Sequence, residues 1–282
     1  MFTLALSTRA ETYDRLSSLL PEYGIEVRHI ETTGRVVQIS PDACSFEECD
    51  VGLVYPSRLM EGGVVDALLE VPWINDCEAI LTSRNKGEVL ARLAHADIPV
   101  PETTLVSNPV SREELKAVFD RFDPPVIVKP NSTTRGTGIT LAYDLDSFLG
   151  ICDYLTLIHE FPAAKDRSFL VQEFVPDARD FRAMVIDGEY VGAVERVGEG
   201  WKHNVHAGAR AEGIRLSEEH RELVERVGTT LDIPFLGVDL LVSEDRAIVT
   251  ETNARPTVDD ATKYEPGFAE RLANLIRSRA QE

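Results

Sequence analysis

The chain has 282 residues, of which 43% are hydrophobic and 27% are charged. This composition is typical of a folded protein and excludes a disordered or low-complexity chain. The formal net charge of −19 argues against nucleic acid and anionic membranes as partners, because both bind to dense basic faces. No stretch reaches the about 18 uncharged apolar residues of a membrane span, and the opening residues do not resemble an export signal. We therefore expect a cytoplasmic protein.

The basic residues of the chain are unusual in kind. Of the 29 lysines and arginines, only those at positions 86, 116, 129, 165, 202 and 263 are lysines. The excess of acidic side chains repels itself at low ionic strength, whereas molar salt screens charges beyond ~3 Å. We expect a halophilic source with a salt-rich cytosol, and the alternative is an ordinary acidic enzyme.

Residues 1–82 alternate short apolar strands with helix-like stretches. Strands are predicted at residues 2–6, 25–30 and 50–56, and helices at residues 11–20 and 64–69. Such alternation favours a βαβ unit with a parallel sheet. No Gly-x-Gly-x-x-Gly follows the first strand, so the dinucleotide-binding fingerprint is absent. We assign residues 1–82 to an N-terminal domain.

The next segment has the pattern of a single helix. We predict that it begins with Ser83 as the N-cap and carries Leu90, Leu93 and Ala94 on one face. We treat residues 83–97 as a linker helix.

A central α+β subdomain is predicted over residues 98–164. Ser111 and Glu114 have the spacing of a capping box and predict a helix start. An apolar strand follows at residues 124–130, and the pattern turns helical again over residues 146–160.

Residues 165–282 form the predicted C-terminal α+β subdomain. Asp187 and Gly188 separate two apolar strands by two residues, which is a strong hairpin signal, and Ser217 is a helix N-cap. Strands are predicted at residues 168–175, 181–186, 189–196, 235–242 and 247–253, and a last helix at residues 268–279.

Two carboxylates and an amide are expected to meet on the last predicted hairpin. If its turn is centred on Asp245, Asp239 lies six positions before it and Glu251 six positions after it, so the two face each other. Asn253 shares the face of Glu251 because strand side chains alternate. Such oxygens favour a hard cation, and Mg²⁺ shared with phosphate is the usual occupant. The alternative is a solvated strand end.

A polar loop with two glycines follows the strand at residues 124–130. Gly136 and Gly138 allow the backbone to approach a phosphate closely, and Ser132, Thr133 and Thr134 add hydroxyl donors. No Gly-Lys-Ser/Thr follows, so the loop is not a Walker loop. An ordinary hairpin loop is the alternative interpretation.

Lys129 stands at the end of the strand before this loop. In a chain with so few lysines, a lysine within reach of a phosphate-binding loop is expected to bind phosphate. Farther along, Gln172, Glu173 and Phe174 lie in a strand that we expect at a domain junction, where the backbone can bond an adenine edge. By itself this segment also fits a half-buried edge strand.

Basic side chains gather on or beside the first hairpin of the C-terminal subdomain. Asp180 and Arg182 share a strand face, and Arg196, Lys202 and Asn204 follow on or after the partner strand. This local density of bases is opposite to the net charge of the chain, and an anionic ligand explains it. Surface ion pairing is the alternative for any single member.

The order of these features resembles the ATP-grasp superfamily, in its RimK/LysX-like carboxylate–amine ligase branch. The resemblance rests on Lys86, VKP at Lys129, STTRGTG, QEFV, RDFR, KHN, VDLL and TETN, and covers nearly the whole chain. It implies an α/β (α+β) fold with an N-terminal Rossmann-like pre-ATP-grasp domain followed by central and C-terminal α+β subdomains. The segment ARPTV after Asn253 lacks the LysX pattern and is nearer to the RimK type, which leaves the substrate open.

The same resemblance implies roles for single residues. Glu173 and Phe174 are implied to contact the adenine. Asp239, Glu251 and Asn253, the trio of the last hairpin, are implied to bind two Mg²⁺ ions, with Mn²⁺ as an alternative. Nucleotide contacts are implied for Lys86, Lys129, Asp180, Lys202, His203 and Asn204.

We conclude from the sequence that the chain is an ATP-dependent carboxylate–amine ligase that works through an acylphosphate, RimK-like and compatible with a glutamate-ligase type. Arg182 and Arg196 are our candidates for holding acylphosphate or carboxylate oxygens. The expected substrates are a small-molecule or peptide carboxylate and an amine, and a homo-oligomer is compatible with this reading. Two alternatives stay open: an ATP-grasp phosphotransferase and a non-catalytic nucleotide-binding regulator.

Overall fold

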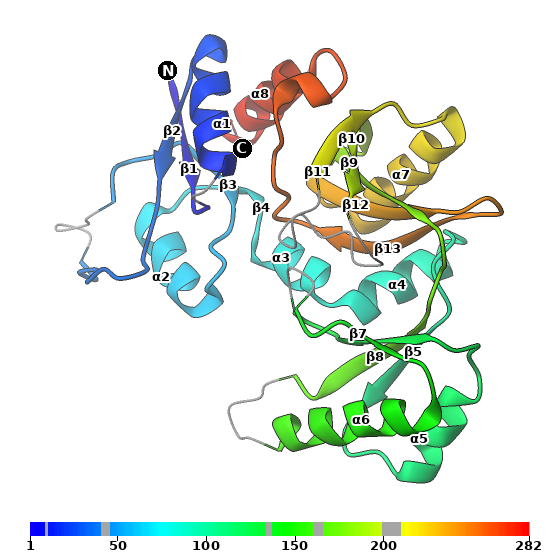
Figure 1. Cartoon of the computed structure of the whole chain (residues 1–282). Coiled ribbons are helices and arrows are strands. Elements are labelled where there is room, and N and C mark those ends of the chain that lie inside the picture. Colours follow the sequence, from blue (N-terminus) through cyan, green and yellow to red (C-terminus); the bar gives the residue numbers. More distant parts are fainter. Residues whose placement is uncertain (9–10, 41–45, 134–136, 161–165, 199–209, 282) are drawn as a thin grey trace.

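The computed structural model describes residues 1–8, 11–40, 46–133, 137–160, 166–198 and 210–281. Its strands form three sheets, one in each third of the chain. The sheets nearest the two termini lie together in the upper part of Figure 1, and the central sheet lies below them. In the described residues, no helix is long and apolar enough to cross a membrane.

The N-terminal sheet is parallel and has the order β2-β1-β3-β4. Its strands are β1 (Phe2–Leu6), β2 (Ile25–His29), β3 (Val51–Val54) and β4 (Trp73–Asn75). The helices α1 (Glu11–Leu19) and α2 (Leu59–Leu69) follow β1 and β3, and a short 3-10 helix, η1 (Leu20–Tyr23), leads into β2. Parallel pairing agrees with the predicted βαβ alternation, whereas β4 was not predicted because three residues are too few for a periodic signal.

The central sheet is antiparallel and has the order β5-β8-β6-β7. Its strands are β5 (Thr103–Ser107), β6 (Val126–Pro130), β7 (Thr140–Ala142) and β8 (Ser168–Glu173). The helices α5 (Arg112–Phe119) and α6 (Leu145–His159) pack against each other, with the rings of Phe119 and Phe148 5.2 Å apart. The predicted capping box of Ser111 and Glu114 is confirmed.

The predicted end of the central subdomain at residue 164 is too early. β8 lies between β5 and β6 in the sheet, although it follows α6 in the chain. This insertion is a long-range pairing that no local pattern reveals. By its hydrogen bonds the central unit therefore extends to the end of β8.

The C-terminal sheet is antiparallel and has the order β11-β10-β9-β12-β13. Its strands are β9 (Arg179–Ile186), β10 (Glu189–Val197), β11 (Arg210–Ile214), β12 (Phe235–Val242) and β13 (Ala247–Asn253). The predicted two-residue turn is confirmed, since both Asp187 and Gly188 have positive φ, at 48° and 78°. Ser217 caps α7 (Glu218–Leu231) as predicted, and the last helix is α8 (Phe268–Arg279).

The predicted helix that begins at Ser83 is in fact two helices, α3 (Cys77–Arg84) and α4 (Lys86–His95). The side chain of Asn85 caps α4 by accepting from the backbone N–H of Glu88. Ser83 instead bonds the end of β13. Its hydroxyl donates to the carbonyl of Thr252 and accepts from the backbone N–H of Ala254. Ala94 is exposed, and the buried face of α4 is formed by Lys86, Val89, Leu90 and Leu93.

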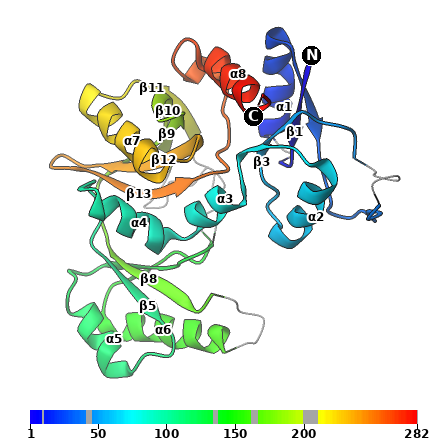
Figure 2. The same ribbon diagram turned by 180° about the vertical axis from the view of Figure 1, so that it is seen from behind.

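One hydrophobic core runs through the N-terminal and C-terminal units, whereas the central unit has a core of its own. The C-terminal helix α8 contacts β3, β4 and β9, and it lies beside α1 in both views of the ribbon (Figures 1 and 2). Asn75 of β4 adds a polar link, since its amide donates to the carbonyls of Phe235 and Ala254 and accepts from the N–H of Phe235. The two terminal units therefore form one body.

Candidate active site

Lys129 is the last residue but one of β6 and is almost completely buried, at 5% exposure. Its Nζ donates to Oε1 of Gln172 on the neighbouring strand β8 at 2.9 Å, and the amide of Gln172 donates to the hydroxyl of Thr103. Burial lowers the pKa of Lys129 to about 8, against the opposing attraction of Glu251. A cation held in this way is poorly compensated and attracts an anion.

Lys86 begins α4 and is 4% exposed. Its Nζ donates to the backbone carbonyl of Thr133 at 2.5 Å and lies 3.3 Å from Oε1 of Glu251. The carbonyl belongs to the loop after β6, and the carboxylate belongs to β13. Lys86 therefore joins the central unit to the C-terminal sheet.

Asp239 and Glu251 lie opposite each other on β12 and β13, as the hairpin prediction required. The reason is different from the predicted one: the register shifts between Asp239 and Leu240, so Thr250 is an extra residue of β13. This bulge brings Glu251 opposite Asp239, whereas a regular ladder from the turn would pair Asp239 with Thr250. Asn253 lies two positions farther, and its Oδ1 accepts from the N–H of Arg255 at 2.9 Å.

Two arginines surround Asp239 in the sheet. Arg182 of β9 forms a bidentate pair with Asp239, with Nε–Oδ1 and NH2–Oδ2 distances of 2.7 and 2.8 Å. Arg196 of β10 bonds Asp180 at 2.5 and 3.1 Å and lies 3.1 Å from Asp239. Burial alone would raise the pKa of Asp239, but the two guanidinium groups outweigh it and lower the pKa to about 2. Asp180 has its pKa raised by burial.

The chain between the central and C-terminal sheets begins at Glu173, the last residue of β8. Its carboxylate accepts from the N–H of Glu102 at 2.8 Å and forms a bidentate pair with Arg246, at 2.5 and 3.1 Å. Arg246 lies between β12 and β13. This ion pair fixes the start of the linker to the C-terminal sheet, and Phe174 beside it is half-buried.

A family profile described as "RimK-like ATP-grasp domain" matches residues 83–276. The matched stretch contains both buried lysines, the paired carboxylates and the two arginines around Asp239. The chain belongs to the RimK-like ATP-grasp family. The prediction of this family from the order of its motifs is confirmed.

Curated relatives of this RimK-like protein are named as glutamate ligases. The tetrahydromethanopterin:alpha-L-glutamate ligase of Methanocaldococcus jannaschii is 32% identical over 212 residues, which are 73% of this chain and 70% of that protein. A probable alpha-L-glutamate ligase of Legionella pneumophila is 30% identical over 67% of this chain, and the match spans 61% of its own length. The predicted enzyme class, an ATP-dependent ligase that forms C–N bonds, is confirmed.

Solved structures of ATP-grasp ligases share the whole fold. D-cycloserine synthetase DcsG is similar over 99% of both chains, with a TM-score of 0.76 and 18% identity. The ATP-grasp ligase PsnB, solved with a minimal precursor, Mg and ADP, is similar over 99% of this chain and 97% of its own, with a TM-score of 0.67 and 16% identity. The predicted ATP-grasp fold is therefore confirmed.

Part of the predicted nucleotide set lies outside the described residues, namely Thr134, Gly136, Lys202, His203 and Asn204. Of the predicted nucleotide ligands in the glycine-rich loop, Ser132, Thr133 and Gly138 are described. Gly138 has a φ of 82°, and a Cβ there would come within 2.9 Å of the ring of Pro130, so a larger residue would be strained. The hydroxyl of Thr133 donates to the carbonyl of Thr137 at 2.9 Å and closes the loop on itself.

Asn131 is a residue that the sequence interpretation missed. Its Oδ1 accepts from the N–H of Gly87 at 2.8 Å, and its Nδ2 donates to Asn85 at 2.9 Å and to Ser168 at 3.1 Å. Its carbonyl accepts from the N–H of Lys86 at 3.2 Å. Asn131 thus attaches the glycine-rich loop to the start of α4, and its position directly before that loop was the available signal.

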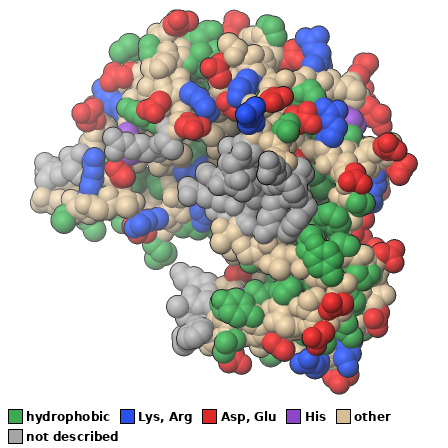
Figure 3. Space-filling model, viewed as in Figure 1, with side chains coloured by type: hydrophobic (Ala, Val, Ile, Leu, Met, Phe, Trp, Pro, Cys, Tyr) green, Lys and Arg blue, Asp and Glu red, His purple; other side chains and the backbone are tan. Residues whose placement is uncertain are grey.

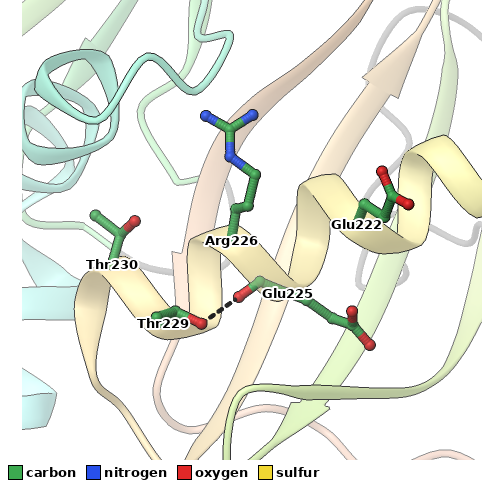
Figure 4. A pocket seen from close by; sticks show the side chains of 5 residues that line it. All are labelled: Glu222, Glu225, Arg226, Thr229 and Thr230. Atoms are coloured by element: carbon green, nitrogen blue, oxygen red, sulfur yellow. Dashed lines mark hydrogen bonds between the residues drawn. The ribbon is translucent and has the colours of Figure 1, made fainter.

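A shallow hollow on α7 lies apart from these residues. Glu222, Glu225, Arg226, Thr229 and Thr230 line it, and Figure 4 shows them along one helix. Arg226 donates to the carbonyls of residues 96 and 97 at 3.0 and 2.9 Å, and therefore attaches α7 to the end of α4. This hollow contains none of the predicted ligands.

Proposed function

We propose that this RimK-like protein joins a substrate carboxylate to the amino group of L-glutamate, through an acylphosphate made with ATP. The observation that carries the proposal is the meeting of opposite charges from different units. Lys86 of α4 lies 3.3 Å from Glu251, which pairs in register with Asp239, and the buried Lys129 is attracted to the same carboxylates. Phosphoryl transfer needs cations for the phosphate oxygens and carboxylates for a divalent ion at one point.

In this proposal Lys129 and Lys86 bind phosphate oxygens of ATP. Their burial supports the assignment, because a charge-assisted bond to a desolvated ammonium is stronger than one in water. Gln172 orients Lys129, and the linker at Glu173 and Phe174 binds the adenine. The remaining proposed ATP ligands are Ser132, Thr133, Thr134, Gly136, Gly138, Asp180, Lys202, His203 and Asn204.

The trio Asp239, Glu251 and Asn253 is proposed to hold Mg²⁺ against the phosphates, as two ions, with Mn²⁺ as an alternative. In the described residues, no group of three or more histidine, cysteine, aspartate or glutamate side chains is arranged for a metal. The trio has only two carboxylates, and its third ligand is an amide oxygen, a donor set that suits Mg²⁺ shared with a nucleotide. Oδ2 of Asp239 already faces both arginines, whereas Oδ1 accepts from Nε of Arg182 and has a second lone pair for an ion. The ion would neutralise charge on the transferred phosphoryl group.

The proposed reaction has two steps. An oxygen of the substrate carboxylate attacks the γ-phosphorus, the bond to the bridging oxygen breaks, and ADP leaves. The amino nitrogen then attacks the acyl carbon, inorganic phosphate leaves, and the proton of the nitrogen passes to solvent. Arg182 and Arg196 hold the acylphosphate oxygens; the bonds of Arg182 to Asp239 use two of its five N–H donors.

L-glutamate is proposed as the amine because the relatives that show the family are named for it. The carboxylate substrate is a small molecule or a peptide. We also propose that the enzyme works in a salt-rich cytosol, supported by the net charge of −19 and by the many acidic side chains on the face shown in Figure 3. A melting temperature that rises steadily from 0.1 M to molar KCl is expected, since added salt screens the repulsion, and a flat profile would contradict the halophilic assignment.

The test is ADP release in molar KCl with carboxylates and L-glutamate supplied separately and together. The proposal predicts release only when both are present, and positional isotope exchange in ATP with the carboxylate alone. Steady ADP release without an amine would support a phosphotransferase instead. ATP binding with no turnover and no isotope exchange for any carboxylate would support a nucleotide-binding regulator.

A further inference from the structure

Arg255 lies two residues after Asn253 and reaches into the N-terminal unit. Its NH1 donates to the hydroxyl of Thr8 at 2.7 Å and to that of Ser7 at 3.3 Å, and its NH2 donates to the carbonyl of Tyr55. Its Nε is buried and has no hydrogen-bond partner among the residues that the structure describes. A buried N–H without a partner loses the free energy of hydration, so such a group needs an explanation, and a bound ligand is one.

A second arginine stands close to Arg255 without neutralising it. Arg84, at the end of α3, donates from NH2 to the carbonyl of Ser57 at 2.7 Å. Arg255 and Arg84 donate to the carbonyls of Tyr55 and Ser57, which are two residues apart in the segment after β3, so both cations reach the same segment. In the part of the chain that the structure describes, neither arginine forms an ion pair with a carboxylate.

Two neighbouring arginines without a carboxylate partner in the described residues are unexpected in so acidic a chain. Acidic residues outnumber basic ones by 48 to 29, and many of the described arginines pair with a carboxylate. Arg182, Arg196 and Arg246 all have one. Within the described ranges, these two half-buried arginines donate to hydroxyl and carbonyl oxygens and to no carboxylate, which leaves them for an anion from outside the protein.

The two arginines lie at the carboxyl ends of the strands of the parallel N-terminal sheet, which is where ligands commonly bind to such sheets. Ser7 and Thr8 directly follow β1, and Tyr55 and Ser57 follow β3, so all four lie at the carboxyl ends of parallel strands. The helix α2 begins next to this point, and its N-cap residue makes no side-chain cap bond. The free N–H groups of a helix start add to the attraction for an anion.

The pair is also adjacent to the proposed metal trio. The N–H of Arg255 donates to the side chain of Asn253, and Ser83, next to Arg84, bonds the backbone on both sides of Asn253. A small ligand bound by the arginines would thus extend toward the paired carboxylates of β12 and β13.

We propose that Arg255 and Arg84 form the binding site for the carboxylates of L-glutamate that do not react. This inference rests on the proposed function, in which the amino group of L-glutamate is the nucleophile. During that attack the α- and γ-carboxylates both remain charged and unused, and two arginines match them in number and sign. The carboxylate that becomes an acylphosphate binds instead beside Arg182 and Arg196.

The test is the binding of L-glutamate to the full chain, measured by calorimetry in molar KCl with Mg²⁺ and a non-hydrolysable ATP analogue. Arg255→Met and Arg84→Met are each expected to weaken binding by about 10-fold or more, the effect of losing one charge-assisted contact. Affinity for the ATP analogue should stay within about twofold of wild type. Arg226→Met is the matched control, because Arg226 also donates to backbone carbonyls but lies on α7.

Two analogues divide the site further. γ-Aminobutyrate lacks the α-carboxylate and L-glutamine lacks the γ-carboxylate, so both should bind wild type more weakly than L-glutamate. One of the two analogues lacks the carboxylate that Arg255 binds. Arg255→Met should bind that analogue almost as well as wild type does, and should bind the other analogue more weakly than wild type does. Melting curves of each variant separate a lost ligand contact from a lost fold, and Arg255→Lys, which keeps the charge, should recover part of the affinity.

Unchanged glutamate affinity in folded Arg255→Met and Arg84→Met would overturn the site, as would wild type that binds γ-aminobutyrate and L-glutamine as well as L-glutamate. Failure of wild type to bind L-glutamate would overturn it too. These outcomes are distinct from failure of the ligase proposal, because binding needs no turnover. Arginine-dependent glutamate binding without any ligation would keep the site and remove the reaction.

Discussion

The central unit and the body formed by the two terminal units differ in how they are held together. The body has one hydrophobic core that includes both terminal sheets and α8, whereas the central unit buries a separate core between its sheet and α5 and α6. Polar contacts connect the two, among them Lys86 to Thr133, Asn131 to Asn85 and Gly87, and Glu173 to Arg246. A unit with its own core and polar contacts to its neighbour can move as a whole.

The proposed site combines groups from both regions. The body supplies the carboxylates, the arginines around them and Lys86, and the central unit supplies Lys129, Gln172 and the phosphate-binding loop. This division assigns different consequences to mutations. A change at Asp239 should affect stability and chemistry together, whereas changes in the central unit should affect nucleotide affinity and leave the body folded.

The largest expected effect is that of Asp239→Asn. Removing the charge leaves Arg182 and Arg196 partly unpaired in the sheet, and breaking a buried ion pair costs about 3–5 kcal/mol of unfolding free energy. Because the folded-state pKa of Asp239 is lowered to about 2, this stabilisation is present above pH 4 and is lost as the pH falls toward 2. Denaturant unfolding at pH 7 measures it.

Glu195→Gln is the matched control for that prediction. Glu195 pairs with Arg179 in the same sheet, at 2.7 Å, but Arg179 is 57% exposed. Solvent screens such a pair, so the loss should stay below about 1 kcal/mol. Equal losses for the two variants would contradict the account of a buried charge cluster in the body.

The next effect is that of Lys129→Ala on the central side of the site. Loss of one charge-assisted phosphate contact should weaken ATP binding by about 1.5–3 kcal/mol. The melting temperature should not fall, because the variant also removes the cost of burying a cation. Calorimetry with ATP and Mg²⁺ decides it, and an unchanged dissociation constant would remove Lys129 from the nucleotide site.

A pH profile sharpens the same assignment. Since the pKa of Lys129 is lowered to about 8, the free enzyme loses this charge as the pH rises from 7 to 9, and ATP affinity should fall by up to about tenfold. Lys129→Arg keeps its charge and should give a flat profile over this range. A wild-type profile as flat as that of the arginine variant would show that another group binds the phosphates.

The smallest effect concerns the polar connection at the linker. Arg246→Gln removes the ion pair with Glu173, in which the arginine is 45% exposed, so the loss of stability should be at most about 1 kcal/mol. The start of the linker should nevertheless become less ordered, which would raise the KM for ATP more than it lowers kcat. The difference from wild type should shrink in molar salt, and an equal change in KM and kcat at all salt concentrations would contradict a positioning role.

Local patterns predicted the helix caps, the tight turn at Asp187 and the hairpin that carries Asp239 and Glu251, since these depend on neighbouring residues. They did not predict the insertion of β8 into the central sheet or the break between α3 and α4 at Asn85, where tertiary contacts of Ser83 override its capping preference. The pairing of Arg182 with Asp239 depends on the register of β9 against β12, more than 50 residues apart in sequence. Arg255 was visible only as part of an atypical segment after Asn253.

The central claim is that the paired carboxylates of the body, Asp239 and Glu251, hold Mg²⁺ against the phosphates of ATP, and that the central unit binds the same nucleotide. The most direct measurement is Mg²⁺-dependent ADP release by Glu251→Gln, with L-glutamate and a carboxylate substrate present, beside its melting curve. Glu244→Gln is the control, because Glu244 is an exposed acid in the turn of the same hairpin. We predict that Glu251→Gln folds and loses ADP release at every Mg²⁺ concentration, while Glu244→Gln keeps it. Wild-type release by Glu251→Gln would contradict the metal site and the mechanism built on it.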